Sequence, residues 1–295
     1  MTETLSNKTW ALAALSVSNM RAIPDHTSEL VSQVMMGTPL KVLDFKDKFY
    51  QVRTPEGYPG WLDAKGLELF TEQEMQAWKI APRFFYNNIS GNVYDEPGKS
   101  GEVVSDLVLG DLFEAEPANI GYLKIKLPDS RTGYVTRAEC ISFDDWTCLE
   151  PDAEPLLSFA KRMMGFPYLW GGASSKAVDC SGFVKLVYYS QGIILARDAS
   201  QQARYGEPID FSNMINLQPA DLLFFGSSAQ RISHMGIYLG KGNFIHSSGR
   251  VHISSIVPGD PKHDPDRIFQ AARRILNSLD TEGITRVKSH PWYNS

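Results

Sequence analysis

Short segments that alternate apolar and polar side chains dominate the first half of the chain. Leu40–Asp44, Phe49–Arg53 and Tyr122–Lys126 alternate in this way, and glycine, proline and aspartate separate such segments. A period of two predicts β-strands with one buried face, and frequent turn residues predict that the strands are short. This pattern is typical of a small β-barrel.

The pattern occurs twice, at a constant offset of 73 residues. Residues 18–61 match residues 91–134, and a glycine followed by Trp61 or Tyr134 closes each copy. A repeat predicts that both copies fold into the same unit. The predicted domains are a first barrel at 1–75, a second barrel at 76–148, an α+β domain at 149–276 and a polar C-terminal tail at 277–295.

The N-terminal apolar run Lys8–Val17 imitates a secretory signal sequence. The run is short, follows the acidic Glu3 and lacks a clear cleavage site. Because the repeat includes residues before Met20, we expect the run to form the opening strand of the first barrel. Three cysteines, Cys140, Cys148 and Cys180, are too few for a disulfide framework. We therefore expect a cytoplasmic protein, with a periplasmic or secreted one as the alternative.

Apolar residues at helical spacing follow in the second half. Glu154–Met164 and Cys180–Gln191 both show the i, i+3, i+4 pattern. Asp179 is a suitable N-cap for the second helix, and Gly192 suits its end. Cys180 then lies in the first turn, where the positive end of the helix dipole favours the nucleophilic thiolate.

A predicted β-hairpin downstream carries two histidines. Ser233–Gly240 and Phe244–Gly249 are typical of strands joined by a glycine-containing turn. Antiparallel pairing brings His234 and His246 together on one face, provided that the register is right. Because a cysteine nucleophile needs a base and the base needs a partner that orients it, we assign these roles to Cys180, His234 and His246 in that order. The same three side chains would also suit a zinc ion or three buried core positions.

Composition narrows the choice of partners. A net charge of -5 and a pI near 5.7 give no basic footprint for nucleic acid. No apolar stretch approaches the roughly 18 residues of a membrane-spanning helix, so we expect no membrane insertion. We also expect no cofactor and no metal, while the oligomeric state stays open.

Four motifs in a fixed order produce a family resemblance. They begin at Tyr168 (Tyr-x-Trp-Gly-Gly), Asp179 (Asp-Cys-Ser-Gly-Phe), Ser233 (Ser-His-x-Gly-Ile-Tyr) and Phe244 (Phe-Ile-His-Ser). This set resembles the NlpC-type peptidases, papain-like cysteine enzymes that cut cell-wall peptides. Both copies of the repeat are similar to bacterial SH3-like domains. The resemblance implies an α+β chain, with a papain-like cysteine peptidase domain after two small SH3-like β-barrels.

This domain order resembles the murein-recycling γ-D-glutamyl-L-diamino acid endopeptidases, also called dipeptidyl-peptidase VI. They hydrolyse the bond between γ-D-Glu and the diamino acid in murein peptides with a free N-terminal L-Ala. The resemblance implies Tyr168 as an oxyanion donor. Asp179 and Ser181 flank the nucleophile, and we expect them to contact the substrate. A bound ammonium group needs an anion and a closed cleft. We expect Glu29, in the hooked segment before the first barrel strand, and Tyr58 to provide them.

Several alternatives remain beside this hypothesis. The protein would also fit an exported hydrolase of intact wall, a non-catalytic wall-binding protein, or an acyltransferase acting on lipids, although no lipid-directed segment is visible. Glu102 occupies the position of Glu29 in the second copy, which leaves a structural role open for both. Arg197 and Asp198 are expected in a loop turn with a salt bridge, and His252 on an outer strand face.

Overall fold

The structure is a computed structural model that describes residues 7–98, 100–118 and 121–294 of the 295-residue chain. The chain divides into two compact units. One comprises Met1–Cys148 together with His290–Ser295, and the other comprises Leu149–Ser289. In the described ranges, no helix is both long enough and apolar enough to cross a membrane.

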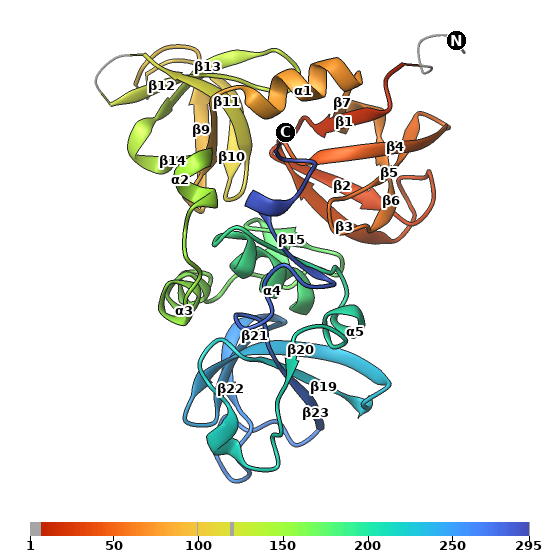
Figure 1. Cartoon of the computed structure of the whole chain (residues 1–295), viewed down its shortest axis with the longest axis vertical. Coiled ribbons are helices and arrows are strands. Elements are labelled where there is room, and N and C mark those ends of the chain that lie inside the picture. Colours follow the sequence, from red (N-terminus) through yellow and green to blue (C-terminus); the bar gives the residue numbers. More distant parts are fainter. Residues whose placement is uncertain (1–6, 99, 119–120, 295) are drawn as a thin grey trace. The chain divides into compact units, whose positions relative to one another are not determined.

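Within its described residues, the first unit contains two antiparallel sheets of seven strands each (Figure 1). In spatial order, the first sheet contains β3 (Leu30–Met35), β2 (Val17–Arg21), β6 (Pro59–Asp63), β5 (Phe49–Arg53), β4 (Pro39–Lys46), β1 (Trp10–Ala13) and β7 (Leu67–Phe70). The second contains β10 (Val103–Val108), β9 (Ser90–Tyr94), β13 (Thr132–Thr136), β12 (Tyr122–Lys126), β11 (Leu112–Pro117), β8 (Arg83–Tyr86) and β14 (Cys140–Ser142). The helical segments are η1 (Ala64–Gly66), α1 (Glu72–Ile80), η2 (Arg137–Glu139) and α2 (Phe143–Thr147).

Each strand of the first sheet has a counterpart that begins 73 residues later and takes the same place in the second sheet. For example, β1 and β8 begin at Trp10 and Arg83, and β2 and β9 begin at Val17 and Ser90. The sequence repeat is therefore also a repeat of structure. The N-terminal run Lys8–Val17 contains β1, which pairs with both β4 and β7 and so forms an interior strand of its sheet.

Alternating apolar residues build a separate core in each sheet, and a buried carboxylate connects the two copies. Met36, in the loop after β3, packs into the core of the second sheet. Asp111 is fully buried, and its carboxylate accepts backbone N–H bonds from Met36 at 3.0 Å and from Val108 at 2.8 Å. Because one oxygen serves each copy, Asp111 ties the repeats together within the unit.

The C-terminal residues differ from the expected tail at 277–295. In the second unit, β24 (Ile284–Arg286) pairs with β17 (Ile193–Leu195), and η4 (Val287–Ser289) follows. In the first unit, His290 Nε2 lies 3.0 Å from the carbonyl oxygen of Pro55, and the Trp292 ring meets the Trp10 ring edge to face. Ile284, Val287 and Tyr293 are buried, and apolar side chains scattered in this way create no periodic signal in the sequence.

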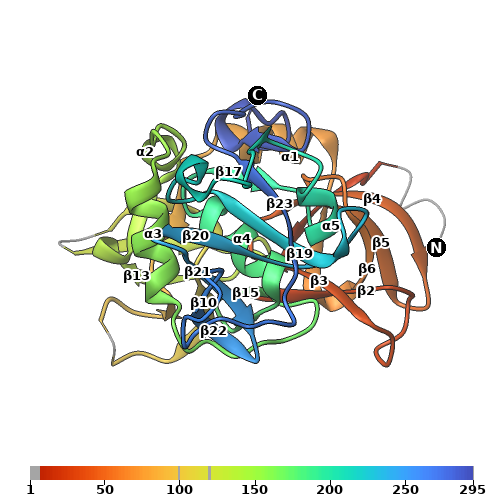
Figure 2. The same ribbon diagram turned by 90° about the horizontal axis from the view of Figure 1, so that it is seen from below.

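The second unit combines three α-helices with a six-stranded antiparallel sheet, counted over its described residues. In spatial order the sheet contains β18 (Glu207–Pro208), β23 (Phe269–Arg274), β19 (Leu222–Ser228), β20 (Arg231–Gly240), β21 (Asn243–Ser248) and β22 (Arg250–Ser255). The other elements are α3 (Ala153–Arg162), β15 (Ala173–Ser174), β16 (Ala177–Val178), α4 (Cys180–Tyr189), α5 (Ala199–Gln202) and η3 (Met214–Asn216). Helix α4 packs against β20 and β21 (Figure 2).

The two elements on which the proposed site depends form as the sequence predicts. Helix α4 begins at Cys180 after the N-cap Asp179, and Gly192 follows it with a positive φ of 70°. The hairpin of β20 and β21 turns at Lys241 and Gly242, whose φ values of 52° and 79° match the left-handed turn that the twist of paired strands favours. The expected helix and hairpin are therefore confirmed.

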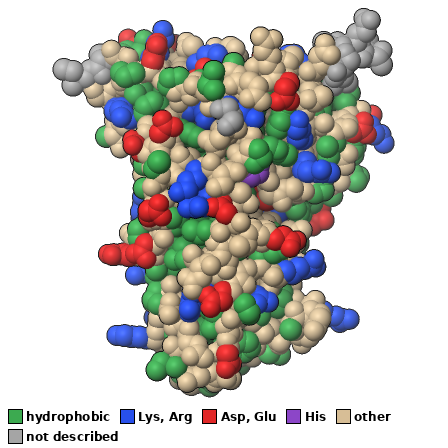
Figure 3. Space-filling view, in the orientation of Figure 1, with side chains coloured by type: hydrophobic (Ala, Val, Ile, Leu, Met, Phe, Trp, Pro, Cys, Tyr) green, Lys and Arg blue, Asp and Glu red, His purple; other side chains and the backbone are tan. Residues whose placement is uncertain are grey.

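Acidic and basic side chains lie interspersed over the described residues on the face that Figure 3 shows. This mixture agrees with the small net charge of -5. A surface of this kind offers no extended basic track on that face.

Candidate active site

The loop before α4 and the first turn of the helix approach each other so closely that glycine is required. A Cβ added to Gly182 would lie 2.0 Å from the carbonyl oxygen of Gly172, and one added to Gly172 would lie 2.7 Å from that of Ala177. No side chain fits at such distances. The glycines of two of the sequence motifs therefore hold the backbone of the loop against the start of the cysteine helix.

A saturated carboxylate fixes this junction. Asp179 accepts hydrogen bonds from the backbone N–H groups of Gly171 and Gly182, from the Ser181 hydroxyl and from two nitrogens of Arg197. Arg197 is only 1% exposed, and its shortest bond to Asp179 is 2.6 Å. A buried charge is tolerated when it is paired and hydrogen-bonded in this way. Asp179 is thus the predicted N-cap, while its contact with substrate remains a prediction.

Arg197 is a residue to which sequence reasoning assigned no chemical role. The expected salt bridge exists, but it crosses from the loop between β17 and α5 to the residue before the nucleophile rather than staying within a turn. Gln202 of α5 supports the same junction by donating to the carbonyl oxygen of Ala196 at 2.9 Å. One signal in the sequence could have pointed to this pair: Arg197 directly follows the apolar run Ile193–Ala196, which favours burial of its side chain. A buried arginine requires a buried partner.

The Cys180 thiol is protonated in the resting site, contrary to the expectation from the helix dipole. Burial raises the pKa of Cys180 to about 11, and the charge of Asp179 adds to the rise. Backbone N–H groups of Ser181 and Met235 bond to the sulfur and partly oppose this change in pKa. Loss of hydration and a neighbouring anion therefore outweigh the dipole of α4.

Two histidines on the hairpin form a directly bonded pair. His234 Nε2 lies 2.7 Å from His246 Nδ1, so the proximity predicted from the hairpin is confirmed. His246 Nε2 lies 2.9 Å from the Ser254 hydroxyl. Burial lowers the pKa of both histidines, and the charge of Arg267 acts in the same direction. Both imidazoles are therefore neutral at physiological pH.

The thiol lies against the strand that carries the first histidine. The N–H group that bonds to the Cys180 sulfur belongs to Met235, which directly follows His234 on β20. Since His234 uses Nε2 for His246, its Nδ1 is the nitrogen left for the thiol. This arrangement suits proton transfer at the moment of attack rather than a preformed ion pair.

Tyr168 also belongs to this site. Its backbone N–H donates to the carbonyl oxygen of Gly249 at 3.0 Å, and its ring is half-buried. Burial raises the pKa of Tyr168 to about 12, and the charge of Cys180, once it has ionised near pH 11, and that of Asp179 add to the rise. The hydroxyl stays protonated near the thiol and is able to donate a hydrogen bond.

His252 has a different place from the one expected. It pairs directly opposite His246 across β21 and β22, and the two ring centroids are 4.3 Å apart. It is therefore on the same face as the histidine pair, because directly paired residues point to the same side of a sheet. Both ring nitrogens of His246 bond to His234 and Ser254, an arrangement that does not fit the zinc alternative.

Glu29 and Tyr58 belong to the first unit. Glu29 is exposed and lies directly before β3, not before the first strand, because β1 and β2 precede it. Tyr58 is half-buried in the turn between β5 and β6, where its carbonyl oxygen accepts the N–H of Thr54 at 3.0 Å. Cys180 belongs to the other unit, so the part of Glu29 and Tyr58 in substrate binding remains a prediction.

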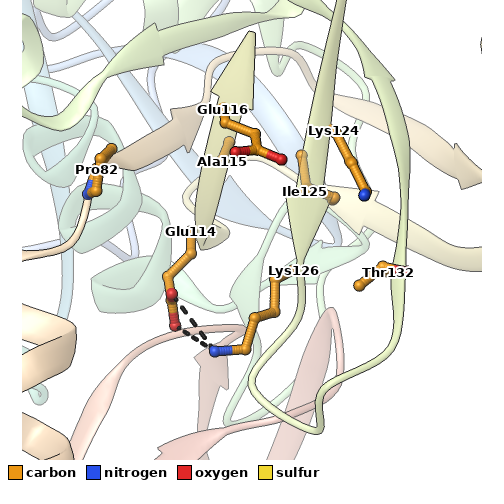
Figure 4. Close-up of a pocket in the computed structure, with 8 residues that line it drawn as sticks. All are labelled: Pro82, Glu114, Ala115, Glu116, Lys124, Ile125, Lys126 and Thr132. Atoms are coloured by element: carbon orange, nitrogen blue, oxygen red, sulfur yellow. Dashed lines mark hydrogen bonds and ion pairs between the residues drawn. The ribbon is translucent and has the colours of Figure 1, made fainter. Parts of the chain in front are cut away.

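The second sheet carries a separate pocket of about 320 Å³ (Figure 4). Its charged residues are cross-strand neighbours on β11 and β12: Glu114 is opposite Lys126, and Glu116 is opposite Lys124. Lys126 binds the Glu114 carboxylate at 3.2 Å. Ordinary cross-strand charge pairing accounts for these residues, so they indicate no particular ligand.

A buried thiol beside the strand that carries a neutral imidazole suits acyl transfer, which is the chemistry of a cysteine peptidase. Comparison with known proteins narrows this class. Residues 165–264 match the NlpC/P60 family, and residues 20–67 match the bacterial dipeptidyl-peptidase Sh3 domain.

Two relatives match over most of their length. The chain is 30% identical over 266 residues to the gamma-D-glutamyl-L-lysine dipeptidyl-peptidase of Bacillus cereus, covering 85% of this chain and 77% of that one. It is 25% identical over 271 residues to dipeptidyl-peptidase 6 of Lysinibacillus sphaericus, covering 87% and 95%. The crystal structure of an NlpC/P60 family protein from Bacillus cereus has the same fold, with a TM-score of 0.77 at 23% identity over 90% and 99% of the two chains. This chain belongs to the NlpC/P60 family, which confirms the resemblance.

Proposed function

We propose that this protein is a cysteine endopeptidase that hydrolyses the bond between γ-D-Glu and the diamino acid in murein peptides with a free N-terminal L-Ala. The observation that carries the proposal is the buried Cys180 thiol beside the directly bonded His234–His246 pair. The match to a dipeptidyl-peptidase Sh3 domain and the name of the Bacillus cereus relative support the substrate class.

In this mechanism Cys180 is the nucleophile and His234 the general base. The sulfur attacks the γ-carbonyl carbon while His234 takes the thiol proton, which then passes to the leaving amine as the C–N bond breaks. A water molecule next attacks the thioester, gives a proton to His234 and releases the γ-D-glutamyl carboxylate, and His234 returns the proton to the sulfur. His246 orients the His234 ring throughout, as the third member of such a triad does.

Charge on the oxygen of the tetrahedral intermediate needs donors that are already in place. The backbone N–H of Cys180 and the hydroxyl of Tyr168 are our candidates. The raised pKa of Tyr168, about 12, supports this role because it keeps the phenol protonated.

We assign the finer architecture as a papain-like peptidase domain at 149–276, preceded by SH3-like barrels at 1–75 and 76–148. The common strand order of the two sheets supports two such barrels. Glu29 and Tyr58 of the first barrel would close the cleft around the L-Ala ammonium group, with Ser181 and Asp179 beside the nucleophile. The three described cysteines are free thiols, which supports a cytoplasmic location for a recycling enzyme.

The test is incubation of the full chain with L-Ala-γ-D-Glu-meso-diaminopimelate and its N-acetylated analogue, followed by mass spectrometry. Cys180→Ala is the control for contaminating activity. We expect cleavage of the free-amine peptide alone, lost in the variant. Cleavage of both peptides would indicate a hydrolase of intact wall and remove the role of Glu29 and Tyr58, while cleavage of neither would overturn the substrate class.

A further inference from the structure

A buried hydroxyl terminates the chain of hydrogen bonds that begins at the proposed base. Ser254 on β22 is 6% exposed, and its Oγ lies 2.9 Å from Nε2 of the fully buried His246. The other nitrogen of that ring, Nδ1, lies 2.7 Å from His234 Nε2. The acyl-transfer mechanism names both histidines but leaves Ser254 without a role.

The two neutral rings admit two proton arrangements. In the first, His234 donates from Nε2 to His246 Nδ1, and His246 donates from Nε2 to Ser254. Nδ1 of His234 is then a free lone pair that accepts the thiol proton. In the second, every bond is reversed: Ser254 donates to His246, His246 donates to His234, and His234 holds a proton on Nδ1. A ring protonated at that nitrogen is unable to act as the base, so only the first arrangement supports catalysis.

The active arrangement requires a buried acceptor at Nε2 of His246. A hydroxyl is such an acceptor, because it offers lone pairs while its own hydrogen rotates about the Cβ–Oγ bond to meet another partner, which a ring N–H of fixed direction is unable to do. Without it, the active arrangement would leave a buried N–H group unpaired, whereas the reversed one would leave only a ring lone pair unpaired. In protein backbones, orphaned buried N–H groups are rarer than under-satisfied carbonyl oxygens. By the same asymmetry, an unpaired ring N–H should cost more than an unpaired ring lone pair. Loss of the hydroxyl would therefore favour the inactive tautomer.

We propose that Ser254 is a positioning residue that keeps the proton of His246 on Nε2 and so leaves Nδ1 of His234 free to act as the base. This inference rests on the proposed roles of Cys180 and His234. Ser254 would act through His246, without touching the substrate or the sulfur.

The first test compares serine variants of the full chain on the free-amine tripeptide. Ser254→Ala is expected to lower kcat about tenfold, the value of one hydrogen bond, with KM unchanged. Ser254→Thr restores the hydroxyl and most of kcat. Ser255→Ala is the matched control, because Ser255 is also buried on β22 but its hydroxyl accepts the N–H of Val257. Ser254→Cys, with a weaker acceptor, replaces the alanine variant if that one fails to fold.

The second test reads the tautomer without substrate. In ¹⁵N-histidine NMR spectra of the wild type, His246 is expected to be protonated at Nε2, and Ser254→Ala shifts the population toward Nδ1. His246→Asn provides an oxygen that accepts from His234 without help, so in that background Ser254→Ala should add no further loss of kcat. An unchanged tautomer in Ser254→Ala, or an equal loss in both backgrounds, would reduce Ser254 to a packing residue. Because the spectra need no substrate, they still decide the proposal if the peptide is not cleaved, in which case the proposed function fails separately.

Discussion

Two polar networks converge on the Cys180 thiol, and they are built in opposite ways. The Asp179 network holds a full negative charge against a full positive charge and saturates the carboxylate with five donor bonds. The histidine network consists of neutral rings, with one hydrogen bond described for each of the three nitrogens involved. The Asp179 network thus holds one carboxylate with five bonds, whereas the histidine network joins each pair of neighbouring side chains by a single bond.

This difference matches what each network has to do. The Asp179 network holds backbone and side chains in one place, and redundant charged bonds make that place rigid. The histidine network has to move a proton. A ring that was permanently charged, or whose lone pairs were already occupied by hydrogen-bond donors, would be unable to accept one. The loop before α4 and the start of α4 thus provide rigidity, while the β20–β21 hairpin carries the groups that transfer the proton.

The largest expected difference between the networks is in stability. Arg197→Ala should lower the free energy of unfolding by about 3–5 kcal/mol, because it leaves the Asp179 carboxylate buried and unpaired. Urea denaturation measures the change. The control is Arg286→Ala, which breaks the more exposed pair with Asp280 and should cost no more than about 1 kcal/mol. Equal effects would contradict the structural role of the Asp179 network.

The second expected difference concerns the state of the thiol. With a pKa of about 11 instead of the ordinary 9.0, Cys180 should carry about a hundredfold less thiolate at neutral pH. Alkylation by iodoacetamide, followed by mass spectrometry of the Cys180 peptide, should therefore accelerate until the pH approaches 11, with the exposed Cys148 as an internal reference. A plateau below pH 8 would show that the thiolate is preformed.

The smallest effect, taken per pH unit and per ring, is the pH dependence of stability that the histidine pair contributes. Burial lowers the pKa of both rings in the folded state below their ordinary 6.5, so the unfolded chain binds more protons below that pH. Their stabilising contribution is present above pH 6.5 and is lost as the pH falls below it, by about 1.4 kcal/mol per pH unit for each ring. Urea denaturation between pH 4 and pH 7 tests this, and His246→Asn should flatten the slope. An unchanged slope would show that other groups cause it.

Local pattern predicted the parts of this site that lie close together in the chain. The N-cap Asp179, the helix from Cys180 and the hairpin that carries His234 and His246 all follow from turn residues and periodicity. The position of His252 did not follow, because one residue of strand register changes the face to which a side chain points. The resting protonation of Cys180 did not follow either, since the dipole of α4 is visible in sequence and burial is not.

The sequence by itself determined the repeat of 73 residues, the order of the elements and the family of this protein, because these depend on spacing along one chain. Only the tertiary structure brought Arg197 to Asp179, across a separation in which no local rule operates, and only the observed strand register placed Ser254 beside His246. It also decided that the thiol and both imidazoles are neutral. Electrostatic energies depend on hydration and on the charges within a few ångströms, and folding sets both.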